Sequence, residues 1–187
     1  MDILANGSLV FQGLKFKNFT GYAPVPPGTY TFTINLSGTG ASVLSSGPHN
    51  LQGGNAYSFY AMGKVANGTL RVMGVGDDVN SPGPGRSKVR VIHGASTAPT
   101  EDVLATAPYA PLPSSPTLSG VPFPLASGYL NVPAGTYQAR VTPAGAKDVA
   151  IDSGRLLLTG DSVRTVIALD PATSGGPFEL FVLPDVN

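Results

Sequence analysis

Cysteine and tryptophan are absent from this chain of 187 residues. The lack of cysteine excludes a disulfide framework, a thiolate nucleophile and a thiolate metal site. Without either residue, the Cys–Trp–Cys hallmark of true immunoglobulin domains cannot occur. Histidine is restricted to His49 and His93. Imidazole chemistry can therefore arise at two positions only, and we expect His49, after a proline, to lie in an exposed loop.

Charge is scarce and balanced. Charged residues make up 12% of the chain, and the formal net charge is zero, whereas soluble domains usually carry about 25%. A neutral chain lacks the basic patch with which proteins bind nucleic acid or acidic lipid. No run approaches the roughly 18 apolar residues of a membrane span, and residues 1–6 do not resemble a signal peptide. We predict no nucleic-acid partner, no membrane insertion and no cofactor.

Glycine and proline are abundant, with 24 and 18 residues, and hydrophobic residues reach 42%. Disorder requires low hydrophobicity and high net charge, and neither condition holds. Short apolar runs with a spacing of two, interrupted by glycine or proline, are typical of β-strands joined by tight turns. The composition therefore predicts an all-β fold without helices.

One ten-residue pattern, Gly-Tyr-x-x-Val-Pro-x-Gly-Thr-Tyr, occurs at residues 21–30 and again at 128–137. Each occurrence predicts a strand, a turn at Pro-x-Gly and a second strand. An offset of about 107 residues also aligns other positions, and a period this long indicates a duplicated domain rather than a solenoid repeat. The aligned pairs include Gly13 with Gly120, Leu51 with Leu158, Ala61 with Ala168, and Val75-Gly76-Asp77 with Leu183-Pro184-Asp185.

The repeat predicts two tandem immunoglobulin-like antiparallel β-sandwich domains, at residues 1–78 and 88–187. A Pro/Gly-rich linker, residues 79–87, separates them. Within the first domain, Asn6-Gly7 between apolar residues predicts a two-residue hairpin turn, and residues 14–17 alternate like a half-buried strand.

The first domain lacks a counterpart to one strand. Residues 88–93 precede Asp102 in the second domain, but no such segment precedes the matching Asp2. A missing strand exposes backbone donors and acceptors along a sheet edge. Three explanations stay open: a strand upstream of this sequence, a shorter sheet, or a strand from another chain. The third predicts a homo-oligomer or a strand-complementing neighbour at the open edge.

The segment Val91-Ile92-His93-Gly94-Ala95-Ser96-Thr97-Ala98-Pro99, followed by Asp102-Val103, and the later Val132-Pro133-Ala134-Gly135-Thr136-Tyr137 resemble a known family. This is the secreted bacterial and archaeal domain-of-unknown-function family 4397. Its members carry a Val-Val-His-Ala-Ser-Pro-Asp-Ala-Pro-like strand end and a Leu-Pro-Ala-Gly-Thr-Tyr motif. Thr97 stands where members carry Asp. The resemblance covers both copies, the first without its N-terminal strand, and implies an extracellular sandwich module with no established activity.

His93 and Asp102 are the first candidate binding residues, because a hydrogen bond between them would close the turn that joins their strands. The alternative is a catalytic or metal pair, but a metal site needs three or four ligands and none cluster nearby in the sequence. Ser162 could act as a hydrolase nucleophile only with His93 beside it. We therefore predict no catalytic residue and no metal ligand.

Tyr109 is the third candidate binding residue, because it lies in a Pro-rich loop, residues 107–116, where an exposed contact is expected. The other tyrosines that could line a sugar-binding face, namely Tyr22, Tyr57, Tyr60 and Tyr129, are expected in the core, as are Tyr30 and Tyr137. Carboxylates at strand ends, Asp77, Asp78 and Asp185, could bind calcium but are too few for its six to eight oxygens. Four glycosylation sequons begin at Asn6, Asn18, Asn35 and Asn67.

These observations favour a non-catalytic extracellular module, a structural or adhesive component of a cell surface or filament. The alternative is a carbohydrate-binding module that contacts glycans through Tyr109, and the second alternative is a serine hydrolase built on Ser162.

Overall fold

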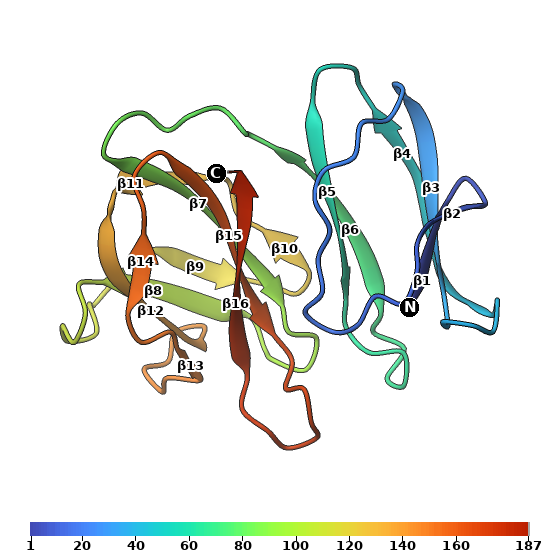
Figure 1. The fold of residues 1–187 in the computed structure, drawn as a ribbon. Coiled ribbons are helices and arrows are strands. Elements are labelled where there is room, and N and C mark those ends of the chain that lie inside the picture. The colour runs from blue at the N-terminus through green and yellow to red at the C-terminus, as the bar shows by residue number, and fades with distance from the viewer. Residues whose placement is uncertain (187) are drawn as a thin grey trace. The chain divides into compact units, whose positions relative to one another are not determined.

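The computed structural model describes residues 1–186, and its regular elements are all β-strands (Figure 1). The predicted all-β sandwich class is confirmed. The chain divides into two compact units, Met1–Asp77 and Asp78–Asn187, here called unit 1 and unit 2. This division falls within one residue of the predicted end of the first domain. Each unit is described by itself.

Unit 1 contains six strands in two antiparallel sheets. One sheet has the order β2-β1-β3-β4 and the other pairs β5 with β6. The predicted hairpin turn is confirmed, since Asn6 and Gly7 have φ of 48° and 82°, as a type I′ turn requires. The strands are β1 (Asp2–Ala5), β2 (Ser8–Phe11), β3 (Gly28–Asn35), β4 (Ser42–Leu51), β5 (Ala56–Met62) and β6 (Arg71–Asp77).

Aromatic side chains join the two sheets of unit 1. The rings of Phe32 on β3 and Phe59 on β5 lie 4.2 Å apart. His49 packs edge-on against Phe59, with ring centroids 5.0 Å apart. The expectation that His49 lies in an exposed loop is therefore wrong. It belongs to β4 and is half-buried, because its place opposite Tyr30 in the β3–β4 ladder directs it toward β5.

Unit 2 is a sandwich of two larger sheets. One has the order β10-β7-β15-β16, with β11 also paired to β7, and the other has the order β13-β12-β8-β9, with β14 paired to β12. The strands are β7 (Arg86–Gly94), β8 (Glu101–Thr106), β9 (Leu118–Val121), β10 (Leu125–Ala126), β11 (Leu130–Pro133), β12 (Gly135–Pro143), β13 (Ile151–Asp152), β14 (Leu156–Leu158), β15 (Ser162–Leu169) and β16 (Glu179–Val186).

One pair of strands in unit 2 departs from the predicted antiparallel pattern. β7 runs parallel to β15, with Ser87 opposite Ser162 and Gly94 opposite Leu169. Parallel neighbours need a long crossover. Here the chain leaves β7 for β8 and β9 in the opposite sheet, returns for β10 and β11, and crosses again for β12, β13 and β14 before it enters β15.

The core of unit 2 lies between its sheets. Val89 of β7, Leu158 of β14 and Val166 of β15 form a buried cluster, against which Val132 and Tyr137 pack. Tyr137 therefore takes part in the core, as predicted.

The two units use the same strand registers. Ile3 pairs with Ile34 and with Phe11 in unit 1, and Val103 pairs with Val141 and with Leu118 in unit 2. Tyr30 lies opposite His49 as Tyr137 lies opposite Leu156. Residues that share a position in this way are called counterparts below.

The strands predicted at residues 14–17 and 21–25 are wrong. Residues 12–27 form no strand, and Lys17 has a positive φ of 63° within a turn. The counterpart segment of unit 2 forms β10 and β11, and both pair with β7. A strand needs a neighbour for its backbone groups, and the part of unit 1 that is described contains no counterpart of β7.

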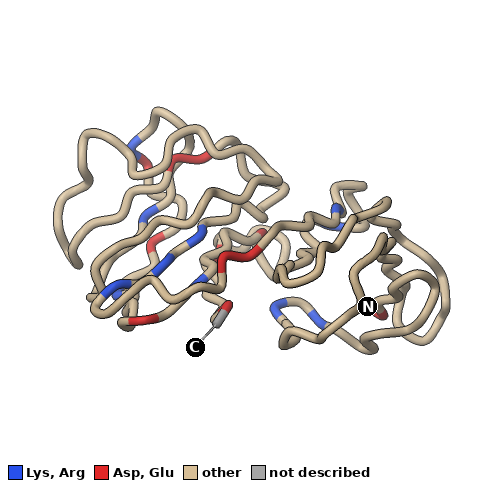
Figure 2. Tube along the Cα trace, turned by 90° about the horizontal axis from the view of Figure 1, so that it is seen from above, with Lys and Arg blue, Asp and Glu red and all other residues tan. Residues whose placement is uncertain are grey.

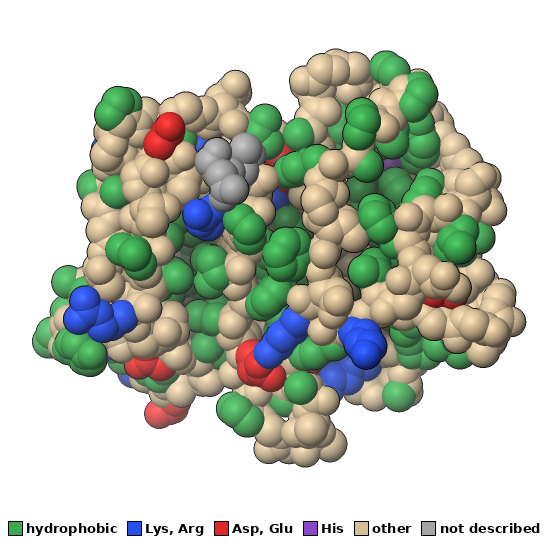
Figure 3. Space-filling model, in the orientation of Figure 1, with side chains coloured by type: hydrophobic (Ala, Val, Ile, Leu, Met, Phe, Trp, Pro, Cys, Tyr) green, Lys and Arg blue, Asp and Glu red, His purple; other side chains and the backbone are tan. Residues whose placement is uncertain are grey.

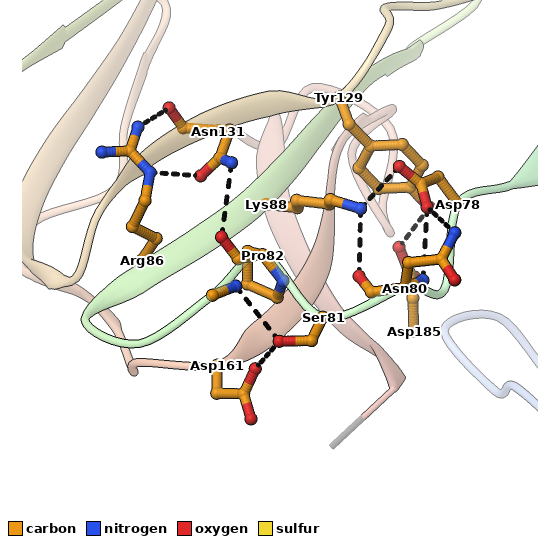
Figure 4. A network of polar contacts seen from close by, with 11 residues as sticks. Asp78, Asn80, Ser81, Pro82, Arg86, Lys88, Tyr129, Asn131, Asp161 and Asp185 are labelled. Carbon is orange, nitrogen blue, oxygen red and sulfur yellow. Dashed lines mark hydrogen bonds and ion pairs between the residues drawn. The ribbon is translucent and has the colours of Figure 1, made fainter.

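The predicted linker belongs to unit 2, where side chains hold it in place (Figure 4). Lys88 Nζ donates to Asp78 Oδ2 at 2.5 Å and to the Asn80 carbonyl oxygen at 3.0 Å. Ser81 Oγ donates to Asp161 Oδ1. These side-chain contacts make the segment before β7 an ordered part of the sandwich. Along the whole trace, charged residues are few and scattered (Figure 2).

We predict that Gly74→Ala destabilises unit 1, because an added Cβ would lie 2.6 Å from Phe59 Cε1 and 3.1 Å from His49 Nδ1. Overpacking of this kind costs about 1–3 kcal/mol of unfolding free energy. Gly76→Ala is the control, since it lies on the same strand with no atom within 4 Å of its added Cβ. Urea unfolding followed by circular dichroism measures both. Equal stability of the two variants would contradict the prediction.

Candidate functional site

Asp102, the second residue of β8, binds two glycine-containing loops. Its Oδ1 accepts a hydrogen bond from the Gly120 amide at 2.8 Å, and its Oδ2 accepts one from the Gly145 amide at 2.8 Å. These amides, that of Gly145 first, lower the pKa of the carboxyl group because they stabilise its charged form. The carboxylate therefore ties together two loops that are distant in the sequence.

Asp2 has the same role in unit 1. Its carboxylate accepts hydrogen bonds from the amides of Gly13 and Gly38, the counterparts of Gly120 and Gly145, at 2.8 and 3.2 Å. It also accepts one from Ser37 Oγ at 2.6 Å, and this bond is the main reason that the pKa of Asp2 is lowered.

Two further polar contacts recur in both units. Phe32 N donates to Ser46 Oγ at 3.0 Å, and the counterpart Ala139 N donates to Ser153 Oγ at 2.8 Å. The hydroxyl groups of Tyr30 and Tyr137 donate to carbonyl oxygens four residues earlier, those of Pro26 and Pro133. The recurring motif of the sequence therefore closes a loop in each unit.

His93 does not bind Asp102, so the predicted hydrogen bond between them is wrong. His93 Nε2 lies 2.9 Å from the Pro99 carbonyl oxygen, and Ala95 N donates to His93 Nδ1 at 3.3 Å. A ring that accepts at Nδ1 and faces a carbonyl at Nε2 carries its proton on Nε2 and is neutral. The side chain braces its own turn.

Glu101 is the functional candidate that the sequence reasoning missed. Its Oε2 lies 3.6 Å from His93 Nδ1, too far for a hydrogen bond, and its Oε1 is buried without a hydrogen-bond partner. Burial raises the pKa of Glu101 to about 7 and lowers that of His93, since a low dielectric disfavours the charged forms. The pair is therefore neutral in mildly acidic solution.

The Glu101–His93 pair lines an apolar cavity of about 80 Å³ between the sheets of unit 2. Val103 and Ala105, at alternate positions after Glu101, line the same cavity. This alternation is the signal that could have revealed Glu101, because residues at i, i+2 and i+4 of a strand share one face.

Ser162 lies away from His93. Its Oγ donates to the Thr159 carbonyl oxygen at 2.7 Å and lies 3.0 Å from Ser87 Oγ. Along the β7–β15 pair, His93 lies opposite Ala168, so six residues, or roughly 20 Å of strand, separate it from the level of Ser162. The arrangement that a Ser162 hydrolase requires is not formed.

Tyr109 is 79% exposed, as predicted. Its backbone adopts a φ of 63°, and its amide donates to Gln138 Oε1 at 2.7 Å, which fixes the loop on β12. Tyr22 is exposed as well, so the expectation that it lies in the core is wrong. Tyr57, Tyr60 and Tyr129 are half-buried. Among the sequon residues, Asn18 and Asn67 are exposed, Asn35 lies within β3, and the Asn6 side chain bonds Thr29 and Thr31.

A cluster of one tyrosine, one aspartate and one hydroxyl residue occurs in each unit. In unit 1, Tyr22 Oη and Ser58 Oγ both donate to Asp77 Oδ2 at 2.7 Å. In unit 2, the counterparts Tyr129 and Thr165 donate to Asp185 Oδ2 at 2.9 and 2.6 Å. The members come from three segments that are far apart in the sequence.

An arginine of β7 completes the cluster of unit 2. Arg90 Nε and Nη2 lie 3.1 and 3.0 Å from Thr165 Oγ1, and Nη2 lies 3.7 Å from Asp185 Oδ2. The guanidinium group also lies over the Tyr129 ring, 4.8 Å from its centroid. A planar cation between a carboxylate and an aromatic ring binds both strongly.

Within residues 1–186, no group of three or more His, Asp or Glu side chains is arranged to hold a metal ion. Asp78 pairs with Lys88, and Asp185 belongs to the Arg90 cluster. In the same part of the chain, no helix is long and apolar enough to cross a membrane.

We predict that Glu101→Gln raises the stability of unit 2 at pH above 7. In the wild type, the pKa of Glu101 rises from 4.5 to about 7 on folding, so the unfolding free energy falls as pH increases between these values. The variant avoids this loss. We expect little difference near pH 4.5 and a gain of about 1–3 kcal/mol near pH 8.

His93 changes stability in the opposite sense, since its lowered pKa makes folding more favourable as pH rises toward 6.5. This contribution is common to both proteins, so the difference between their denaturant midpoints isolates Glu101. Asp148→Asn, an exposed carboxylate of unit 2, serves as the control. A pH-independent difference for Glu101→Gln would show that Glu101 does not titrate in this range.

Unit 1 and the start of unit 2 match a protein-family model. The family model described as "Domain of unknown function (DUF4397)" matches residues 1–104, which include unit 1, β7 and most of β8. Curated proteins gave no match. The matched segment is more than half of the 187 residues, and the chain therefore belongs to the DUF4397 family.

Proposed function

We propose that the chain is a non-catalytic structural or adhesive module of a cell surface or surface filament, acting outside the cell. The observation that carries this proposal is the recurrence of the same polar contacts in both units. These hydrogen bonds hold loops and strand ends in place. Polar side chains with this role are expected in a structural protein.

The recurrence also supports the inference that the chain is a tandem duplication of one sandwich, with one strand fewer in the first copy. The supporting pairs share spacing, strand register and hydrogen-bond partners: Asp2 and Asp102, Ser46 and Ser153, Tyr30 and Tyr137, Asp77 and Asp185. A duplicated module extends the reach of a surface protein without a new fold.

The surface of unit 1 favours contact with other polypeptides. Exposed apolar side chains are concentrated between residues 9 and 25. Hydrophobic side chains, drawn in green, are also visible on the face of the molecule that Figure 3 shows. Groups of exposed apolar side chains commonly mark interaction sites. Those between residues 9 and 25 are Leu9, Val10, Phe16, Phe19, Tyr22 and Val25.

Immunogold electron microscopy of intact, unpermeabilised cells of the source organism tests the proposal. We expect antibodies against the purified chain to label the cell envelope or filaments that project from it. Cells with the gene deleted are the control. Labelling that requires permeabilisation would contradict a surface role.

A carbohydrate-binding module is the second candidate, because Tyr109 exposes 79% of its surface on a loop fixed by Gln138. Exposed aromatic rings of this kind stack on sugars. If this candidate is correct, Tyr109→Ala should lose at least about fivefold in affinity for the glycan that the wild type selects on an array, if a ring stacked on a sugar contributes as much as one stacked on a nucleic-acid base, about 1–3 kcal/mol. Tyr109→Phe keeps the ring and is the control. Equal glycan binding by all three proteins would remove this candidate.

A further inference from the structure

The cavity between the sheets of unit 2 has a volume of about 80 Å³, and the proposed structural role makes no use of it. Its wall is mainly apolar and includes Val89 of β7, Val103 of β8 and Val141 of β12. The interior of a folded protein is close-packed, with few voids larger than a water molecule. A cavity of this size is therefore a candidate binding site.

Two exposed residues of the wall mark the opening of the cavity. These are Ala105 and Thr117, which are adjacent because Ala105 N donates to Thr117 Oγ1 at 3.0 Å. Glu101 lies four residues before Ala105 on the same strand, roughly 13 Å away, and is buried. The path from the opening therefore runs along β8 to Glu101.

Glu101 differs from the other polar residues of the wall in its hydrogen bonding. Both ring nitrogens of His93 lie within hydrogen-bond distance of backbone groups. The Tyr137 hydroxyl donates to a backbone carbonyl oxygen, and Thr117 Oγ1 accepts from a backbone amide. Glu101 Oε1 is buried and has no partner among the described residues. One hydrogen-bonding position in the wall is therefore open to a ligand.

The size and polarity of the cavity limit what it can bind. A buried water molecule needs two to four polar partners, and Glu101 alone offers an unpartnered atom in the described wall. Since an apolar cavity of about 150 Å³ binds benzene, one about half that size admits roughly three or four non-hydrogen atoms. In mildly acidic solution the Glu101 carboxyl is protonated, because burial raises its pKa to about 7. A protonated carboxyl both donates and accepts a hydrogen bond, and an uncharged hydroxyl group matches it.

We propose that unit 2 binds a short aliphatic alcohol inside its sandwich, with the alkyl chain against Val89 and Val103 and the hydroxyl group hydrogen-bonded to Glu101 Oε1. Burial of the alkyl chain provides the driving force. The hydroxyl group gives Oε1 a partner, which removes the cost of a buried polar atom without a hydrogen bond. This site goes beyond the proposed surface role and does not depend on it.

Titration of 1-propanol into the full chain tests the site, at a pH below the Glu101 pKa of about 7 and with NMR spectroscopy of the methyl groups. We expect saturable shifts of the Val89 and Val103 signals, with a dissociation constant on the order of millimolar, because so small a ligand makes few contacts. The methyl groups of Ile34 and Met62, buried in unit 1, are the control. Shifts that do not saturate, or equal shifts in both units, would show a solvent effect and overturn the proposal.

Variants of Glu101 test the contact with the hydroxyl group. Glu101→Leu should weaken 1-propanol binding about fivefold, which corresponds to the loss of one neutral hydrogen bond. Glu101→Gln keeps a donor and an acceptor and should bind 1-propanol more tightly than Glu101→Leu. Circular dichroism confirms that each variant is folded. Equal affinity of the two variants, or tighter binding of propylammonium than of 1-propanol by the wild type, would overturn the assignment of the hydroxyl group to Glu101.

A pair of alanine variants tests the position of the alkyl chain. Ala105→Leu should weaken 1-propanol binding about fivefold or more, because the larger side chain occupies part of the cavity at its opening. Ala107→Leu is the control, since Ala107 is exposed two residues further along the chain and lies outside the wall of the cavity. Equal affinity of the two variants would place the alcohol elsewhere and overturn the proposal.

Discussion

The pairing of β7 is the constraint on which the arrangement of unit 2 depends. Every buried backbone N–H and C=O group needs a partner, and β7 provides partners for β15 on one edge and for β10 and β11 on the other. Its side chains contribute to both faces of the sheet, with Val89 in the core and Arg90 on the polar cluster. Unit 1 has the flanking segments without such a strand, and one of them, residues 12–27, has no regular structure.

Polar side chains in both units serve mainly to tie distant segments together. Asp2 and Asp102 each bind two loops. Hydrogen bonds stabilise the charged form of both carboxylates, first from Ser37 Oγ and then from amides for Asp2, and from amides for Asp102. Glu101 differs because burial opposes its charge and its Oε1 has no partner. A buried carboxyl group without a full set of hydrogen bonds costs stability once it ionises, so unit 2 tolerates it next to a neutral histidine.

Much of the fold could be predicted from local patterns. Alternating apolar residues and Gly/Pro turns indicated an all-β chain, and Asn6-Gly7 indicated its hairpin, because φ above zero at two successive positions favours those residues. The exposure of Tyr109 followed from its Pro-rich loop. The strand predicted at residues 14–17 was wrong because alternation describes a strand only where a neighbour is present to pair with it. His93 and Asp102 were assigned to each other by their proximity in the sequence, but their side chains point to different partners.

The sequence by itself determined the class of fold, the repeat, the turn positions and the low charge, since each of these follows from residue type and spacing. Only the tertiary structure decided which side chains meet. Asp102 binds the amide of Gly145, and Arg90 binds Thr165, across long stretches of chain. Such contacts depend on strand order and on the face that each strand presents, and these are set by the packing of the whole sandwich.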